Sequence, residues 1–483
     1  MLKKIMVAAG VLAWIPMAGA AGRSLFDPPN VVVFFTDDHG YADLGVHGQC
    51  DDVRTPNLDQ LARDGVRFTD GYVTAPQCSP SRAGLMTGRY QQRFGFEHNA
   101  AGPLPLDEVT LADRMSRAGY RTGMIGKWHL EPNWTMRDWT ARVLNEPDPK
   151  PGLRIPFRKI LPYYPGARGF DDYYKGELKR YWVNYGLDGA ERADDGEWVN
   201  KKGYRLELQT EAALEFIDRN HENPFFLYVA YFAPHVPLEA TEQYLARFPG
   251  EMPERRRYAL AMISAVDDGV GKVRDKLADL GIERDTLIFF ISDNGAPLKI
   301  DMKDLPISFR GGAWDGSMNT PWTGEKGTIM EGGVHVPFLA AWPGTIPSGQ
   351  VCEDPVISLD VAPTCLAAAG EPEAAELEGV NLLPRLRGEI DALPDRELYW
   401  KFWRQAAVRR GRWKYLRLSD GREYLFDLES DQHEHRNLIR THPERAAELR
   451  GKLEDWAAGN RPAGLPDEPL NSQEEKWYAH YLD

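Results

Sequence analysis

Short apolar runs, each followed directly by polar or ionisable residues, are the feature that most constrains the fold of this 483-residue chain. Four such runs are rich in residues that favour β-strands, and they cover residues 30–35, 121–126, 224–232 and 285–291. Segments with a helical period lie between the runs, at residues 57–65, 110–118, 204–220 and 256–280. Strands that alternate with helices predict an α/β fold with a large, mostly parallel sheet sandwiched by helices.

The polar residues that follow these runs are expected to meet at one edge of the sheet. They are Asp37 and Asp38 after the first run, Lys127 and His129 after the second, His235 after the third, and Asp293 and Asn294 after the fourth. In open α/β sheets the ligand crevice lies beyond the carboxyl ends of the strands. Residues far apart in the sequence are therefore predicted to form one site.

Two of these clusters carry oxygen ligands. Asp37 and Asp38 end one strand, and Asp293 and Asn294 end another. Three carboxylates and one amide oxygen form a hard, oxygen-only set that suits Ca²⁺ or Mg²⁺. Adjacent acids can also cap helices or lie in solvent, but two pairs at equivalent strand ends favour the metal site.

A cysteine begins the second chemical feature. In the segment 75–88, APQCSPSRAGLMTG, Ser79 and Pro80 have the pattern of an N-cap followed by proline at the first helical position, so a helix is predicted directly after Cys78. Arg82 follows one helical turn later. A nucleophile, a helix N-terminus and a guanidinium so close together predict a site for a tetrahedral anion. The alternative is that Cys78 is a small packed hydrophobe.

The same segment carries a resemblance to a known family. Residues 78–82 (CSPSR), followed by GLMTGR at 84–89, resemble the signature of type I, formylglycine-dependent sulfatases in the alkaline phosphatase superfamily. Other segments match that family in order: TDD at 36–38, TPNLD at 55–59, GKWH at 126–129, PH at 234–235, SDNG at 292–295, EKG at 325–327 and AVR at 407–409. The resemblance spans nearly the whole chain after residue 20, and it implies an alkaline phosphatase-like fold.

The resemblance also implies the cofactors and the roles of individual residues. Cys78 would be oxidised by a formylglycine-generating maturation enzyme to formylglycine (3-oxoalanine), whose hydrate is the nucleophile. One Ca²⁺ would be held by Asp37, Asp38, the modified Cys78, Asp293 and Asn294. The sulfate would be surrounded by the catalytic residues Arg82, Lys127, His129, His235 and Lys326. The equivalent of a further polar sulfate contact in the family is not located between residues 133 and 200.

The implied activity is hydrolysis of sulfate monoesters in a sulfated polysaccharide or oligosaccharide. One alternative is a phosphoester or phosphonate hydrolase of the same superfamily. Such enzymes commonly have Asp-His at the second metal pair, where this chain has Asp293 and Asn294. The other alternative is a non-catalytic binder of anionic glycans.

Candidate substrate-binding residues lie outside these motifs. His98 could reach the cleft. The insertion at residues 134–200 is rich in aromatic and cationic residues, which can stack on sugars and pair with further sulfates, and from it we single out Arg168, Tyr181 and Trp182. Lys401, Trp403 and Arg404 form a similar group in the C-terminal part. The insertion could equally be a structural excursion packed on the domain.

The N-terminus predicts export. Residues 1–20 contain two lysines, an apolar run and the small-residue site AGA, which is the layout of a cleavable signal peptide. No later segment has the length of a membrane anchor, so we expect a periplasmic or secreted protein. The formal net charge of −14 argues against general nucleic-acid binding.

The remaining chain predicts two domains. Residues 21–375 would form the catalytic domain. Short aromatic segments between 397 and 428, joined by turn-like residues and followed by a polar helix, predict a smaller C-terminal α+β domain at 376–483 with an antiparallel sheet. Cys352 and Cys365 could form a disulfide or remain buried thiols, because spacing alone does not establish the geometry of a disulfide.

Overall fold

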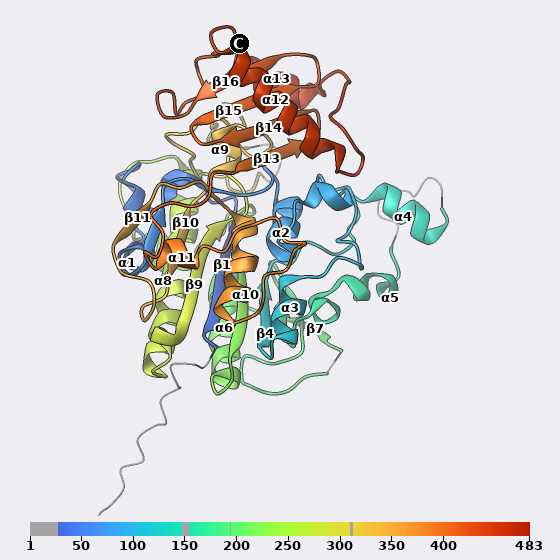
Figure 1. Cartoon of the computed structure of the whole chain (residues 1–483). Helices are drawn as coiled ribbons and strands as arrows, with labels where there is room; N and C mark the ends of the chain where they lie inside the picture. Colours follow the sequence, from blue (N-terminus) through green and yellow to red (C-terminus); the bar gives the residue numbers. More distant parts are fainter. Residues whose placement is uncertain (1–27, 147–153, 194, 310–312) are drawn as a thin grey trace, which may run out of the picture.

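The computed structural model describes residues 28–146, 154–193, 195–309 and 313–483. The predicted signal peptide at 1–20 lies outside the described residues. A ten-stranded sheet forms the centre of the molecule, with the strand order β11-β2-β10-β9-β1-β8-β4-β5-β6-β7 (Figure 1).

The middle of this sheet is parallel and buried. It consists of β1 (Asn30–Asp37), β4 (Arg121–Gly126), β8 (Phe225–Pro234) and β9 (Thr286–Ser292). β1 pairs in parallel with β8 on one side and with β9 on the other, so that Val31 lies between Phe226 and Leu287. Every residue of β1, β8 and β9 is buried, which explains why these strands are continuous apolar runs and not alternating ones.

The outer strands make the sheet mixed. On one side lie β2 (Val66–Phe68), β10 (Phe338–Ala341) and β11 (Gln350–Cys352), and on the other β5 (Asp172–Lys175), β6 (Arg180–Val183) and β7 (Glu197–Asn200). β10 is antiparallel to β9, and β5, β6 and β7 form an antiparallel ribbon. A separate pair consists of β3 (Gly71–Tyr72) and β12 (Val356–Ile357).

Helices cover both faces of the sheet. Alternate residues of β1 belong to two hydrophobic cores: Val31 and Val33 to one, Val32 and Phe34 to the other. The first core includes α2 (Cys78–Thr87), α3 (Leu111–Arg117) and α10 (Val361–Ala368), and the second includes α1 (Pro56–Asp64), α6 (Arg205–Asn220) and α8 (Glu254–Asp279). The shorter helices are α4 (Arg137–Leu144), α5 (Phe157–Ile160), α7 (Glu242–Leu245), α9 (Glu331–Val334) and α11 (Leu383–Leu386).

A small antiparallel sheet follows in the C-terminal part. Its strands are β13 (Glu397–Phe402), β14 (Gln405–Arg410), β15 (Trp413–Leu418) and β16 (Glu423–Asp427), in sequential order, with α12 (Pro443–Ala458) and α13 (Ser472–Tyr481). Figure 1 shows this sheet above the carboxyl ends of the central strands. The predicted fold class is confirmed, whereas the domain boundary at 375/376 stays a prediction.

Two further observations bear on the sequence-based predictions. All four cysteines lie among the described residues, and each is a free thiol, including Cys352 and Cys365. In the described part of the chain, no helix combines the length and apolar character needed to cross a bilayer.

Candidate active site

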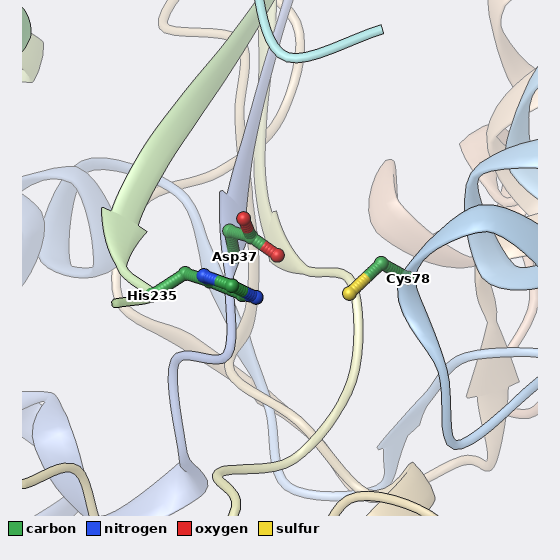
Figure 2. Close-up of side chains that lie close together, drawn as sticks. All are labelled: Asp37, Cys78 and His235. Atoms are coloured by element: carbon green, nitrogen blue, oxygen red, sulfur yellow. The ribbon is translucent and has the colours of Figure 1, made fainter. Parts of the chain in front are cut away.

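The polar residues at the carboxyl ends of the central strands converge as the sequence predicts. One ligand atom from each of Asp37, Asp38, Cys78 and Asp293 lies within 4.8 Å of those of the others, and all four residues are buried. His235 forms a similar group with Asp37 and Cys78. Figure 2 shows these three side chains pointing toward one another from β1, from the end of β8 and from the start of α2. We give the name strand-end cluster to the nine residues that meet here: Asp37, Asp38, Cys78, Arg82, Lys127, His235, Asp293, Asn294 and Lys326.

Backbone geometry fixes the two acidic pairs against each other. Asp37 is the last residue of β1, and Asp38 then adopts a φ of 64°, which turns the chain out of the strand. The Asp38 backbone NH donates to Asp293 Oδ1 at 3.1 Å, and the Asp293 NH donates to the Thr36 carbonyl at 3.0 Å. The three carboxylates are therefore held together by the sheet and not by chance side-chain rotamers.

Asn294 adds a buried amide oxygen to the three carboxylates. Its Nδ2 donates to Asp38 Oδ1 at 2.7 Å and to the Gly295 carbonyl at 2.9 Å. Its Oδ1 is buried and has no hydrogen-bond partner among the described residues. A buried amide oxygen without a partner is costly unless it binds something. The chemistry of this donor set, with three carboxylates and one amide oxygen, fits a hard cation.

The helix that carries Cys78 begins two residues earlier than predicted. α2 starts at Cys78 with Gln77 as its N-cap, so Ser79 is not the cap. The Ser79 NH donates instead to the Asn99 side chain at 3.1 Å. The error arose because a serine before a proline resembles a cap, whereas here Asn99 from a distant loop satisfies the free NH group. Cys78 still lies in the first turn, facing the acidic pairs.

Arg82 lies one turn into α2, as expected, and its guanidinium is fully buried. Its Nε and Nη2 donate to Asp293 Oδ2 at 3.1 and 2.7 Å, and its Nη1 donates to the Lys127 carbonyl at 3.1 Å. The planar fork thus ties α2 to the ends of β4 and β9.

Two lysines contact the first acidic pair. Lys127 Nζ lies 3.0 and 2.8 Å from the two oxygens of Asp37, and Lys326 Nζ lies 2.7 and 2.8 Å from those of Asp38. Three cations therefore face three carboxylates in a space from which water is largely excluded. A divalent cation added to this balanced set would make it electropositive and suited to an anion.

The two histidines are held differently. His235 Nδ1 donates to the Val236 carbonyl at 2.6 Å, and its Nε2 lies 3.7 Å from Asp38 Oδ2. His129 has a φ of 59°, and its Nδ1 is buried without a hydrogen-bond partner among the described residues. Burial lowers the pKa of His235 to about 4, although Asp37 and Asp38 oppose this shift. Burial, with Lys127 and Arg82, lowers the pKa of His129 well below its usual value.

The carboxyl groups of Asp37 and Asp293 have very different pKa values, because the two negative charges lie close together. Burial alone would raise the pKa of Asp37, but Lys127, His235 and Arg82 hold it well below its usual value. Burial and the charge of Asp37 raise the pKa of Asp293 to about 7, although Arg82 opposes this shift. Burial and Asp293 also raise the pKa of the Cys78 thiol, so an unmodified Cys78 is a poor thiolate nucleophile here.

Comparison with known proteins identifies the family that has this arrangement. A family model described as Sulfatase matches residues 29–371, which includes every residue of the strand-end cluster. The chain belongs to the sulfatase family. It is therefore a sulfuric ester hydrolase, and neither the phosphoester hydrolase nor the non-catalytic binder considered from the sequence is supported. A second model, described as N-sulphoglucosamine sulphohydrolase, C-terminal, matches residues 323–458.

Individual relatives agree with this assignment. N-acetylgalactosamine-6-sulfatase from Mus musculus is 33% identical over 394 residues, covering 75% of this sulfatase and 67% of the relative. Arylsulfatase A from Bos taurus is 35% identical over 388 residues, with coverages of 77% and 71%. The crystal structure of Ps i-CgsB in complex with k-i-k-neocarrahexaose superposes with a TM-score of 0.74 at 30% identity, covering 94% of this chain and 97% of that one.

The fold extends beyond sulfatases. A phosphonate monoester hydrolase of Agrobacterium radiobacter has a TM-score of 0.61 at 23% identity, covering 89% of this chain and 95% of that one. At this identity the likeness shows the shared fold alone.

One residue of the sulfatase site escaped the sequence analysis. The hydroxyl of Tyr228 accepts a hydrogen bond from Arg82 Nη1 at 3.3 Å and is fully buried. Tyr228 lies within the apolar run of β8, where a tyrosine gives no signal that distinguishes it from a packing residue. Only the meeting of β8 with α2 reveals the contact.

The structure corrects the prediction for the insertion. Arg168 is buried and donates to the backbone carbonyls of Leu104, Pro105 and Glu108. Tyr181 is fully buried and donates to the Leu178 carbonyl, and Trp182 is enclosed by other aromatic rings. All three side chains are packed inside the domain, which argues against their expected role in substrate binding.

The other substrate-binding candidates divide into two groups. Lys401 is buried with its Nζ 2.7 Å from Glu97 Oε1, and its role in substrate binding stays a prediction. Arg404 pairs with Glu468, and Trp403 stacks on Phe402 and Trp477. His98 is partly buried next to Asn99, the residue that contacts the start of α2. The roles of Trp403, Arg404 and His98 stay predictions.

Proposed function

We propose that this sulfatase is exported and hydrolyses sulfate monoesters of a sulfated polysaccharide or its oligosaccharides. The observation that carries the proposal is the convergence of Cys78 with three carboxylates and three cations at the carboxyl ends of the central strands. Two relatives support a sugar substrate: one is named an N-acetylgalactosamine-6-sulfatase, and a structural neighbour at 30% identity was solved with a neocarrahexaose.

We propose one Ca²⁺ in the strand-end cluster. Asp37, Asp38, Asp293, Asn294 and the modified residue 78 would hold it, and the unpartnered Asn294 Oδ1 supports this assignment. When bound, the ion would polarise the sulfate and favour an ionised hydroxyl at residue 78.

We propose that Cys78 is converted to formylglycine by a maturation enzyme. The modified side chain would supply a hydrated aldehyde as the nucleophile. The raised pKa of the unmodified thiol supports the need for such a conversion, because a buried neutral thiol beside Asp293 attacks poorly. The family signature at residues 78–82 supports it as well.

The chain's own residues would bind the sulfate and transfer protons. Arg82, Lys127 and Lys326 would face the sulfuryl oxygens and stabilise the negative charge that develops on them. A sugar alkoxide is a poor leaving group, so a proton donor is needed, and His235 or Lys326 fills this role. His129, whose buried Nδ1 is free of a protein partner among the described residues, would act as the base.

The layout of residues 1–20 supports export to the periplasm or the exterior. We retain the division into a catalytic domain at 21–375 and a C-terminal α+β domain at 376–483 as part of this proposal. Trp403, Arg404 and His98 are retained as residues that could line the cleft.

The test uses protein purified from its native source or produced with a formylglycine-generating enzyme. Mass spectrometry of the Cys78 peptide should show the aldehyde, and elemental analysis should show one calcium per chain. A panel of sulfated oligosaccharides should release sulfate, and NMR should identify the desulfated carbon. An unmodified Cys78 together with faster hydrolysis of phosphate esters than of sulfate esters would overturn the proposal.

A further inference from the structure

A cavity of about 760 Å³ opens beside the strand-end cluster and is not part of it. It is formed by the turn between β5 and β6, by Trp198 on β7, and by the segment 237–239 that follows β8. We call it the ribbon cavity. Its volume lies within the range of small-molecule and sugar sites.

Specific contacts connect the ribbon cavity to the candidate active site. Lys175, on its wall, pairs at 2.6 Å with Glu131, which lies two residues after His129. Arg205 donates to the carbonyls of His235 and Pro237 at 3.1 and 2.8 Å, so the cavity wall and His235 are held by one side chain. The wall of the cavity is therefore linked to the segments that carry His129 and His235.

The cations on the cavity wall differ in their availability. Lys175 is buried and neutralised by Glu131. Lys179 and Arg180 are exposed, and the described residues provide neither of them with an ion-pair partner. The Arg180 guanidinium lies over the Trp198 ring at 4.3 Å, which holds its planar fork in place. Arg180, held over Trp198, and the neighbouring exposed Lys179 can together bind an anion.

The same wall carries hydrogen-bond acceptors. Glu177 and Glu239 line the cavity with Lys179 and Arg180. A surface that alternates charged donors and carboxylate acceptors matches a sugar, whose hydroxyls donate and whose acidic substituent accepts.

We propose that the ribbon cavity is a subsite for the sugar residue next to the sulfated one, in which Lys179 and Arg180 bind an acidic group of that residue. This inference rests on the proposed function and narrows its substrate class to oligosaccharides that carry a second acidic group beyond the reacting sulfate. The acidic group is a sulfate or a carboxylate, which share the same recognition by a guanidinium fork.

The test compares substrates that do and do not fill the cavity. The quantity measured is the ratio of kcat/KM for an oligosaccharide to kcat/KM for 4-nitrophenyl sulfate, which reaches only the sulfate site. A carrageenan hexasaccharide offers a sulfate on a neighbouring residue, and a chondroitin 6-sulfate tetrasaccharide offers a carboxylate. For whichever oligosaccharide is the substrate, Arg180→Ala should lower the ratio about ten-fold, the scale of one charge-assisted hydrogen bond, and Lys179→Ala should lower it less.

Two further variants make the result decisive. Arg180→Lys keeps the charge but loses the stacked fork, so the ratio should fall to an intermediate value. Lys272→Ala removes an exposed cation from α8, away from the cavity lining, and should leave the ratio unchanged. An unchanged ratio in Arg180→Ala, or an equal fall in Lys272→Ala, would overturn the subsite.

Failure of the proposed function would be visible separately. If the wild-type protein released no sulfate from any compound, calorimetric titration with the carrageenan hexasaccharide and the chondroitin 6-sulfate tetrasaccharide would still decide the subsite. Binding that weakens in Arg180→Ala but not in Lys272→Ala supports the assignment of the ribbon cavity as a sugar subsite. Equal binding by both variants, or no binding by the wild type, contradicts it.

Discussion

Two buried clusters of charged side chains in the described part of the molecule differ in how their carboxylates are arranged. The strand-end cluster brings together three carboxylates whose oxygens converge with the Cys78 sulfur within 4.8 Å. The second cluster, between the large sheet and the C-terminal sheet, consists of Glu331, His335, Arg409, Lys414 and Glu434. We call it the inter-sheet cluster. Both are shielded from water, so their difference does not arise from burial.

In the inter-sheet cluster, opposite charges alternate. Lys414 Nζ lies 2.8 Å from Glu331 Oε1 and 2.9 Å from Glu434 Oε1, and His335 Nδ1 lies 2.9 Å from Glu331 Oε2. Burial would raise the pKa of Glu331, but Lys414 and His335 hold it below its usual value. The ionised form of Glu331 is thus stabilised, whereas burial and the charge of Glu331 raise the pKa of Glu434 to about 7, although Lys414 opposes this shift.

In the strand-end cluster each carboxylate also has a cationic partner, but the three carboxylates and the Cys78 sulfur converge on one another. The raised pKa of Asp293 and the unpartnered Asn294 Oδ1 are both costs that folding alone does not explain. Alternating charges therefore indicate a structural network. Converging carboxylates with an unpartnered hydrogen-bond acceptor indicate a ligand-binding site.

The largest expected effect is on the nucleophile. Cys78→Ala should lower sulfate release by roughly four orders of magnitude or more, because the group that attacks sulfur is removed. The folded structure should persist, since the side chain is small. Steady-state assays with circular dichroism test this. Cys365→Ala, at another buried free thiol, is the control and should retain activity; equal loss in both variants would mean that Cys78 only packs.

The next effect separates activity from stability. Asp293→Asn should lower the calcium content and reduce kcat/KM by about 10²–10³-fold, the scale of lost electrostatic stabilisation in a transition state. Its free energy of unfolding without calcium should fall less than in Glu331→Gln, because the loss of the charge partner of Arg82 is offset by relief of the repulsion from Asp37. Elemental analysis and chelator-treated denaturation curves measure both quantities.

The pH dependence gives this variant a second readout. A carboxyl group whose folded pKa is about 7, above its unfolded value, contributes stability at low pH that is lost as the pH rises toward 7. In the metal-free Asp293→Asn variant, the free energy of unfolding should not show this loss between low pH and pH 7. A variant that lost as much stability at pH 7 as Glu331→Gln would show that Asp293 is structural.

The inter-sheet cluster should respond in the opposite way. Glu331→Gln should cost about 3 kcal/mol of unfolding free energy, because Lys414 loses one of its two buried partners. The kcat of the folded fraction should stay close to that of the wild type. Urea denaturation measures the loss, and Glu429→Gln, at an exposed ion pair, should cost less than about 1 kcal/mol. Similar losses in the two variants would contradict the comparison.

The smallest effect concerns positioning within the strand-end cluster. Tyr228→Phe removes one hydrogen bond to Arg82 and should lower kcat/KM about five-fold, equivalent to about 1 kcal/mol. Tyr231→Phe is the matched control on the same strand, because its hydroxyl contacts Thr210 at 2.8 Å and not Arg82. The prediction fails if both variants have the same kcat/KM.

The sequence predicted the parts of this site that depend on local pattern. The strand runs, the acidic pairs at their ends and the helix at Cys78 follow from residue period and from short-range chemistry, and a motif at 78–82 gave the family. Ser79 was wrongly assigned as the cap because the competing acceptor, Asn99, comes from another loop.

The insertion shows where such prediction fails. Aromatic and cationic residues look alike in a sequence whether they face a cavity or a core. Arg168, Tyr181 and Trp182 are enclosed by neighbours from distant segments, whereas Lys179 and Arg180, next to them in the chain, line the ribbon cavity.

What the sequence by itself determined was the order of strands and helices, and hence which edge of the sheet would carry polar groups, because these follow from the period of apolar residues. What only the tertiary structure decided was which of those groups are paired. A lysine between two carboxylates and a carboxylate beside two others have the same local sequence signals. Whether the ionised form of each group is stabilised or destabilised depends on neighbours that the fold brings from far along the chain.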